Sequence, residues 1–219
     1  MPRLLFEKKG NAIWISHLDL MRVFQRSFKR AGLPLTHTQG FSPRPSVSIA
    51  LPLSVGIESS CELLDFDLDG EPIPEAEIKR RLNEKLVEGV RVLDVYTGGQ
   101  KIKYLALLDC CLTLQYDGGV PEGAAEKIRA LLSREEVTVT KKSKSGNTEQ
   151  NIIPMIRKAA VRETNQNTLT VQARICCQNP SLNPMQIAFA IEKYLPECTP
   201  SFVECSRMEI YDQKEQQFR

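Results

Sequence analysis

Two different spacings of apolar and polar residues occur along this chain, and they predict strands and helices. Between Cys61 and Leu68 apolar residues alternate with aspartates, which is the two-residue period of a half-buried strand. Between Ser16 and Gly32 the apolar positions instead recur every three or four residues and therefore share one face of a helix. Ser16 is a suitable N-cap and Gly32 a suitable stop signal, so we predict a helix between them.

The same signals predict the remaining elements. In the first half we expect further strands at Arg3–Lys8, Leu33–His37, Val47–Leu51 and Val90–Tyr96, and a helix from Pro74 to Gly89. In the second half we expect strands at Tyr104–Tyr116, Val137–Thr140, Ile152–Val161, Leu169–Cys177 and Phe202–Tyr211, helices within residues 122–133 and from Asn183 onward, and a polar loop at Lys141–Asn147.

This order of elements occurs twice, about a hundred residues apart, without a repeat of the residues themselves. It predicts an α+β fold with two tandem ferredoxin-like (split βαβ) domains, each an antiparallel sheet with its helices on one face. We expect an N-terminal domain at residues 1–99, which carries the sequence motifs, and a C-terminal domain at residues 100–219. Thr97–Lys101 would be the hinge between them.

Composition places the chain among ordinary soluble proteins. Of its 219 residues 42% are hydrophobic and 26% are charged, and no apolar run is long enough to cross a membrane. The first ten residues lack the apolar core of a signal peptide, so we expect a cytoplasmic protein with no membrane partner. The seven cysteines include no CxxC pair; we expect reduced thiols that behave as small apolar residues, with no bound metal and no cofactor.

Charge is segregated although the net charge is only +2. Residues 1–45 carry eight Lys or Arg against two acids, and residues 46–97 carry eleven acids against five bases. A local basic surface is therefore more plausible than a generally basic protein, and such a surface fits RNA phosphates.

Several short motifs carry a family resemblance. They are Ser16–Asp19 (SHLD), Arg30–Gly32 (RAG), Gly40–Pro45 (GFSPRP) and Val55–Ser59 (VGIES). With them the chain resembles a radical-SAM-linked bacterial domain family of unknown function, in the stand-alone form found with cobalamin-binding radical-SAM proteins. The resemblance covers essentially the whole chain and implies such a protein as partner. The sequence has no CxxxCxxC, so it lacks the cysteines for the cluster of that chemistry.

Basic residues on the first helix are the main binding candidates. Four cations fall on the helix face opposite the apolar one and repel each other unless an anion or a carboxylate lies near them: Arg22, Arg26, Lys29 and Arg30. They could equally be a solvated face, or be paired with acids such as Glu58, Glu62 or Asp65. A second, weaker candidate is the basic loop that contains Lys141, Lys142 and Lys144.

The loop Gln39–Pro45 is a candidate for presenting a fixed arginine. Pro43 and Pro45 restrict the backbone on both sides of Arg44, so its guanidinium would be held at little entropic cost for a phosphate or carboxylate. Gly40 allows a positive φ or a close backbone approach. The alternative is an ordered connection in which Phe41 fills the core and Arg44 pairs with an acid such as Glu58.

His17 is the candidate for catalysis, because a histidine near neutral pKa can act as acid or base. It could instead tie the helix to a loop or contact RNA. Trp14, which precedes the cap, is expected to pack as a hydrophobic staple or in the core, and not to stack on a base. We therefore expect a non-catalytic RNA-binding or enzyme-docking module beside a radical-SAM RNA-modifying enzyme. The alternatives are a metal-independent, nuclease-like RNA-processing enzyme that uses His17, or a docking subunit with no RNA contact.

Overall fold

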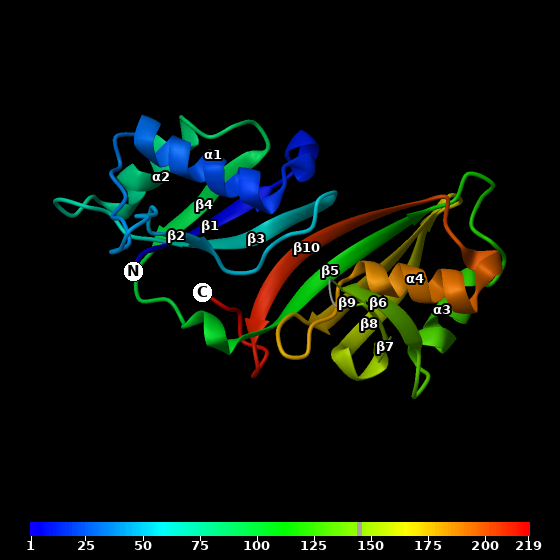
Figure 1. Cartoon of the computed structure of the whole chain (residues 1–219). Coiled ribbons are helices and arrows are strands. Elements are labelled where there is room, and N and C mark those ends of the chain that lie inside the picture. The colour runs from blue at the N-terminus through cyan, green and yellow to red at the C-terminus, as the bar shows by residue number, and fades with distance from the viewer. Residues whose placement is uncertain (144–145) are drawn as a thin grey trace. The chain divides into compact units, whose positions relative to one another are not determined.

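The computed structural model describes residues 1–143 and 146–219, without the side chains of residues 142 and 143. The chain divides into two compact units, one formed by Met1–Ile102 with Arg219 and the other by Lys103–Phe218 (Figure 1). Both contain strands and helices, with four α-helices among the described residues, so the predicted α+β class is confirmed.

The first unit has four strands and two helices. They are β1 (Arg3–Lys8), α1 (His17–Arg30), β2 (Val47–Ile49), β3 (Ile57–Phe66), α2 (Glu75–Asn83) and β4 (Val90–Tyr96). Within this unit the strands lie in the order β4-β1-β3-β2, and each neighbouring pair is antiparallel. Leu4 pairs with Leu64 on one side and with Val95 on the other, which places β1 at the centre.

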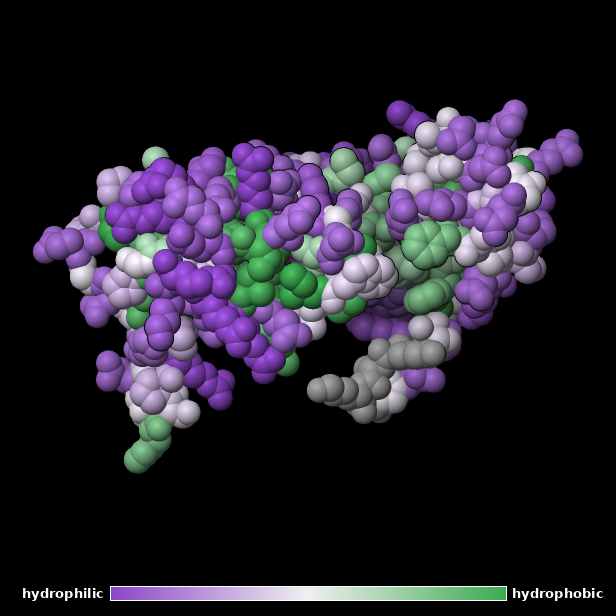
Figure 2. All heavy atoms as spheres, turned by 90° about the horizontal axis from the view of Figure 1, so that it is seen from above, coloured by the Kyte–Doolittle hydropathy of each residue, from purple (hydrophilic) through white to green (hydrophobic). Residues whose placement is uncertain are grey.

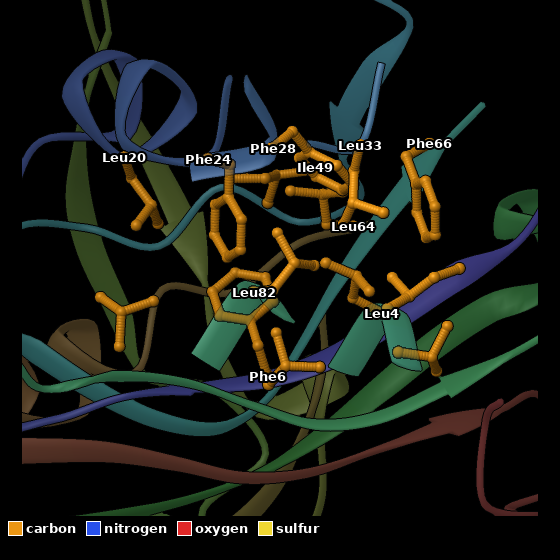
Figure 3. Packing of buried hydrophobic residues seen from close by; sticks show 14 of the residues in the cluster. Leu4, Phe6, Leu20, Phe24, Phe28, Leu33, Ile49, Leu64, Phe66 and Leu82 are labelled. Carbon is orange, nitrogen blue, oxygen red and sulfur yellow. The ribbon is translucent and has the colours of Figure 1, made fainter. Parts of the chain in front are cut away.

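The core of the first unit lies between this sheet and α1 (Figure 3). Phe24 of α1 meets Phe6 of β1 edge to face, with ring centroids 4.7 Å apart. Phe28 meets Phe66 of β3 at 5.1 Å, and Leu82 of α2 is buried in the same cluster. The apolar face predicted for the first helix is therefore its buried face, and the charged positions are left on the outside.

The second unit repeats the strand and helix order with an inserted hairpin. Its elements are β5 (Leu105–Gln115), α3 (Ala124–Leu132), β6 (Thr138–Ser143), β7 (Gly146–Asn151), β8 (Ile156–Asn165), β9 (Thr168–Cys176), α4 (Met185–Tyr194) and β10 (Phe202–Asp212). Within this unit the sheet order is β10-β5-β9-β8, again antiparallel throughout. The hairpin β6–β7 forms a separate two-stranded sheet.

Burial in the second unit follows its sheet order. The interior strands β5 and β9 contribute many buried apolar residues, among them Leu112, Leu114, Val171 and Ile175. At the end of the order, β8 is exposed at most positions, and Val161 is its buried residue. Three cations occupy exposed or half-exposed positions on this edge strand: Arg157, Lys158 and Arg162.

Most sequence-predicted elements are present, and two predictions are wrong. Arg3–Lys8 and Val90–Tyr96 are confirmed at both ends. The strand expected at Leu33–His37 is reduced to two isolated bridges, because Pro34 has no N–H to contribute to a ladder. The polar loop expected at Lys141–Asn147 is instead, where it is described, the end of β6 and the start of β7.

Candidate nucleic-acid interface

The cations of helix α1 lie on its solvent-exposed face, because the opposite, apolar face is buried in the core. The Ser16 hydroxyl accepts a hydrogen bond from the Asp19 N–H at 3.2 Å, which caps the helix as predicted. Leu20, Phe24 and Phe28 are buried. The four predicted cations, Arg22, Arg26, Lys29 and Arg30, are all exposed. Figure 2, which looks onto the side that carries α1, shows hydrophilic side chains gathered there.

Two of these cations have partners within the first unit. Arg22 forms an ion pair with Asp19, one turn earlier, at 2.8 Å, and both side chains remain more than half exposed. Arg30 donates to the Lys85 carbonyl at 2.7 Å and to the Ser27 hydroxyl at 3.2 Å. A carbonyl does not cancel the charge of a guanidinium, so Arg30 still contributes to the positive surface while it fastens α1 to the segment after α2.

Arg26 and Lys29 form no hydrogen bond or ion pair with the residues that the structure describes. The acids that could have covered them are engaged elsewhere. Asp65 pairs with Arg3 at 2.5 Å, and Glu58 accepts from the Gly10 N–H at 3.0 Å.

The third acid, Glu62, is buried beside Lys8. Burial lowers the pKa of Lys8, and the charge of Glu62 opposes that shift. The internal pairing that would have neutralised α1 is therefore not formed by these three acids.

The loop at Gln39–Pro45 is pinched at its base and exposed at its tip. The Thr38 N–H donates to the Arg44 carbonyl at 2.9 Å, and the Arg44 N–H donates to the Thr38 hydroxyl at 3.0 Å. The Arg44 guanidinium is exposed and has no partner among the described residues, so the alternative pairing with Glu58 is wrong. Gly40 has a φ of +131°, which explains the glycine.

Phe41 corrects a second alternative for this loop. Its side chain is fully exposed, so the alternative in which Phe41 fills the core is wrong. The core of the first unit is already closed by Phe6, Phe24, Phe28 and Phe66, so the loop is free to carry an aromatic ring in solvent. Exposed rings beside cations are a feature of surfaces on which unpaired bases stack.

A cavity joins the end of α1 to this loop. It has a volume of about 430 Å³ and is lined by Lys29 on the helix and by His37 and Pro45 at the base of the loop. His37 and Pro45 also form an isolated bridge. Because Arg44 directly precedes Pro45, the structure brings Lys29 and Arg44 to the same part of the surface.

His17 and Trp14 lie at the other end of α1. His17 is half-buried and forms no hydrogen bond with the described residues; the nearby Asp19 carboxylate is taken by Ser16 and Arg22. A histidine base is ordinarily oriented by a second group, which these contacts do not supply. Trp14 is 65% exposed beside Gly56, so the expected hydrophobic staple is wrong.

The second predicted basic group belongs to the other unit. Lys141 lies on β6 and lines a cavity next to α4. Lys144 lies outside the described residues, and so does the side chain of Lys142. Lys141 and the backbone of Lys142 therefore belong to a strand, and not to an irregular loop.

Sequence reasoning missed a charged cluster in the second unit. Arg174 donates to both carboxylate oxygens of Asp109, at 2.7 and 2.8 Å, and to Glu215 at 2.5 Å. Its guanidinium lies 3.7 Å from the ring centroid of Tyr211, whose hydroxyl donates to Asp109. Single charges within the apolar strands LALLDCCLTL and TLTVQARIC were the signal that could have revealed this pair.

The cluster shifts the pKa values of its members. Burial alone would raise the pKa of Asp109, but hydrogen bonds from Arg174 and Tyr211 outweigh it and lower that pKa. Burial raises the pKa of Tyr211, and the hydrogen bond to Asp109 raises it further. Because its charges are paired in this way, the cluster serves to hold β5, β9 and β10 together.

The cysteines are free thiols. Six are buried and Cys111 is half-buried. Burial raises the pKa of Cys177 and of Cys205 to about 12, so these thiols stay protonated and unreactive. Among the residues that the structure describes, no three His, Cys, Asp or Glu side chains are grouped so that they could hold a metal ion. No described helix is long and apolar enough to span a bilayer.

Comparisons with known proteins give a family and a fold. A family described as "Uncharacterized protein conserved in bacteria (DUF2344)" matches residues 2–184. No curated protein matches the chain.

Among solved structures, a chain of a Cbf5-Nop10-Gar1 complex is similar with a TM-score of 0.54 at 10% identity, over 95% of this chain and 48% of that one. A chain of the archaeal box H/ACA sRNP Nop10-Cbf5 complex is similar with a TM-score of 0.48 at 9% identity, over 94% of this chain and 46% of that one. This chain spans about half the length of those chains, and the likeness concerns the fold alone.

Proposed function

This chain belongs to DUF2344, a family of uncharacterised proteins conserved in bacteria, and we propose that it binds RNA without catalysing a reaction. The surface that binds would be the exposed face of α1 together with the loop that carries Arg44. We name this the α1 surface and define it by Arg22, Arg26, Lys29, Arg30 and Arg44.

One observation carries the proposal: Arg26, Lys29 and Arg44 form no ion pair with the described residues. Cations that are not paired internally gain most from an external polyanion, because no ion pair is lost when the anion binds. Arg44 also stands between two prolines, so little backbone freedom is lost when it forms a bidentate contact with a phosphate.

The strand orders support the finer description of the fold. In each unit the strands that correspond in sequence order lie as fourth, first, third and second, and all neighbouring pairs are antiparallel. We propose that each unit is a ferredoxin-like, split βαβ domain, with the boundary near residue 100. The two domains then share one architecture, and they differ in the charges on their first helices.

The proposed partner is suggested by the motifs of the first unit. The Ser16–Asp19 and Gly40–Pro45 motifs resemble those of proteins linked to cobalamin-binding radical-SAM enzymes. We propose that the chain acts in the cytoplasm beside such an enzyme and holds RNA for it through the α1 surface. In this arrangement the enzyme supplies the chemistry, and this chain supplies binding and positioning.

The test is the salt dependence of RNA binding by the wild type and by two matched double variants. The probe is a fluorescein-labelled single-stranded RNA of mixed sequence and about 20 nucleotides. Arg26→Gln with Arg44→Gln neutralises two unpaired cations, and Arg80→Gln with Arg81→Gln neutralises two cations of α2 that are paired with Glu77. Both changes remove the same charge from the same unit.

We expect the α1-surface variant to bind about tenfold more weakly and to lose about 1.4 from the slope of log K against log salt, at about 0.7 per phosphate contact. The α2 variant should stay within about twofold of wild type, because its cations already have partners. Equal losses in the two variants, or binding by wild type that salt does not change, would contradict the proposal. Recovery of an enzyme partner that resists both high salt and nuclease would favour a docking subunit instead.

A further inference from the structure

On the edge of β6 that does not pair with β7, the backbone N–H and carbonyl groups face α4. Val137 uses its N–H and carbonyl for the β7 side: it donates to the Asn151 side chain and accepts from the Ile152 N–H. Thr138 faces the other way, since its N–H donates to the Tyr194 hydroxyl at 3.1 Å and its carbonyl accepts from Lys193 at 2.9 Å. Backbone direction alternates along a strand, so the N–H and carbonyl of Thr140 face the same way as those of Thr138.

A cavity of about 840 Å³ opens where this edge and α4 diverge. Val139, Thr140 and Lys141 of β6 line one side, and Gln186, Phe189 and Lys193 of α4 line the other. Tyr194 and Lys193 close one end through their contacts with Thr138. The result is a groove between the free edge of a strand and a helix, and its volume lies in the range of ordinary ligand sites.

Gln186, which lines this groove, has an unused hydrogen-bond donor. It is only 5% exposed, and its amide oxygen accepts from the Asn183 N–H at 3.2 Å, which fixes the orientation of the amide. Its amide nitrogen is buried and has no hydrogen-bond partner among the described residues. A buried donor left without an acceptor costs free energy, so an occupant that offers a carbonyl oxygen would be stabilised here.

Phe189 contributes an apolar surface. Its neighbours Ile187, Ala188, Ala190 and Ile191 are buried, whereas the Phe189 ring is 51% exposed at the groove. Figure 2 shows hydrophobic atoms at the surface over α4. An exposed ring beside an unused donor and a free strand edge combines the features that bind an extended peptide.

We propose that this groove binds an extended peptide segment of a partner protein, which adds as a strand to the edge of β6. A backbone carbonyl of the peptide would accept from the Gln186 amide, and an apolar side chain would cover Phe189. Lys141, which has no ion pair with the described residues, favours an acidic residue in the peptide. Glu192 also lines the groove, so its charge is mixed, which suits a peptide with a single acidic residue placed at Lys141 better than a continuous chain of phosphates.

The experiment uses the full-length chain and a phage-displayed library of random twelve-residue peptides. The consensus peptide is then synthesised with a fluorescein label, and its affinity is measured by anisotropy for wild type and two proline variants. Thr140→Pro removes an N–H from the edge that faces α4. Asn147→Pro removes one from the outer edge of the same hairpin on β7, where the pairing of Asn147 with Lys142 places its N–H away from β6.

We expect Thr140→Pro to weaken the peptide by at least about tenfold and Asn147→Pro to leave it within about twofold. Phe189→Ser, at an exposed position that should not affect folding, should also weaken it by about tenfold, and the Thr140 amide should gain protection from hydrogen exchange when the peptide binds. Circular dichroism confirms that each variant is folded.

The proposal is overturned if no peptide is enriched, or if the peptide binds Thr140→Pro and Phe189→Ser as tightly as wild type. It is also overturned if the mixed-sequence RNA displaces the peptide from this groove. The Arg26→Gln and Arg44→Gln double variant should keep full peptide affinity, so loss of RNA binding and loss of peptide binding can be told apart.

Discussion

Helices α1 and α3 occupy the same place in the repeated order of elements, after the first strand of each unit, and yet they handle their cations differently. On α3, Arg129 pairs with Glu126 at 2.8 Å and donates to the Val161 carbonyl, and Lys127 pairs with Glu197 at 3.1 Å. On α1, Arg26 and Lys29 have no such partners among the described residues. Equal positions in one architecture therefore carry a neutralised surface in one unit and a positive surface in the other.

The difference shows that a run of basic residues identifies a binding surface only when its internal partners are known. Helix α2 makes the same point inside the first unit. Its Arg80 and Arg81 both pair with Glu77, and Arg80 also pairs with Glu84. The positive charge of this dipeptide is therefore neutralised by nearby acids of the same segment. These contacts lower the pKa of Glu77 to about 2. α1 has one acid in its first turn, Asp19, and among the described cations it forms an ion pair with Arg22 alone.

The largest expected effect on stability comes from the apolar faces of α1 and α3, because each of these faces is buried in the core of its own unit. Phe24→Ala on α1 should lower the free energy of unfolding by about 3–5 kcal/mol, and Ile128→Ala on α3 by about 2–5 kcal/mol, because both open cavities in a core. Urea denaturation followed by circular dichroism measures this. The matched control is Phe41→Ala, at a fully exposed ring, which should change stability by less than about 0.5 kcal/mol. A large loss in the control would mean that the loop packs on the core.

A smaller effect is expected from the paired charges of the second unit. Asp109→Asn should cost about 2 kcal/mol at pH 7, because it weakens the bond to the buried Arg174. The pKa of Asp109 is lower in the folded state than in the unfolded state. Its contribution to the free energy of unfolding is therefore complete above the unfolded-state pKa of about 3.9, and it is lost as the pH falls through the folded-state pKa.

The same contrast can be measured as a function of pH. Wild type should therefore lose more stability between pH 6 and pH 3 than Asp109→Asn, when urea melts of both are compared. Equal losses would show that Asp109 does not titrate with folding. Arg26→Gln on α1 should leave stability unchanged at both values, because it breaks no ion pair with the described residues.

The smallest effect comes from adding an acid beside the cations of α1 and removing the acid beside a cation of α3. Gln25→Glu places an acid four residues before Lys29, so it should stabilise α1 by about 0.3 kcal/mol and weaken RNA binding by about threefold. Glu126→Gln on α3 removes the acid beside Arg129 and should alter RNA affinity by less than twofold, because Arg129 still donates to Val161. Anisotropy with the RNA probe measures both changes, and tighter binding by Gln25→Glu would refute this account of α1.

Much of the fold could be predicted because local patterns determine it. Short apolar runs at Arg3–Lys8 and Val90–Tyr96 predict both strands with their ends, and the cap and stop signals place the ends of α1 to within two residues. The hairpin β6–β7 could not be predicted in this way. Its polar strands lack an apolar alternation, and pairing between the strands holds them together.

The sequence could predict which residues form the candidate site, but not which acids pair with its cations. Helical spacing identified Arg26 and Lys29, and the Gly40–Pro45 motif identified Arg44, but whether acids cover them depends on pairing across the sheet. Asp65, for instance, meets Arg3 because β1 and β3 are antiparallel with those residues in register. Asp109 and Arg174 face each other for the same reason, 65 residues apart. Register between distant strands is a tertiary property, and no local spacing encodes it.

The edge strand β8 has a consequence for how this protein behaves at high concentration. A strand at the end of a sheet can recruit a strand of another molecule and begin an aggregate. The exposed cations Lys158 and Arg162 stand on that edge, and like charges would meet if two copies aligned there. We therefore expect these two charges to oppose edge-to-edge pairing of β8 between copies. Replacing them with threonine should make the purified protein more prone to form fibres during storage.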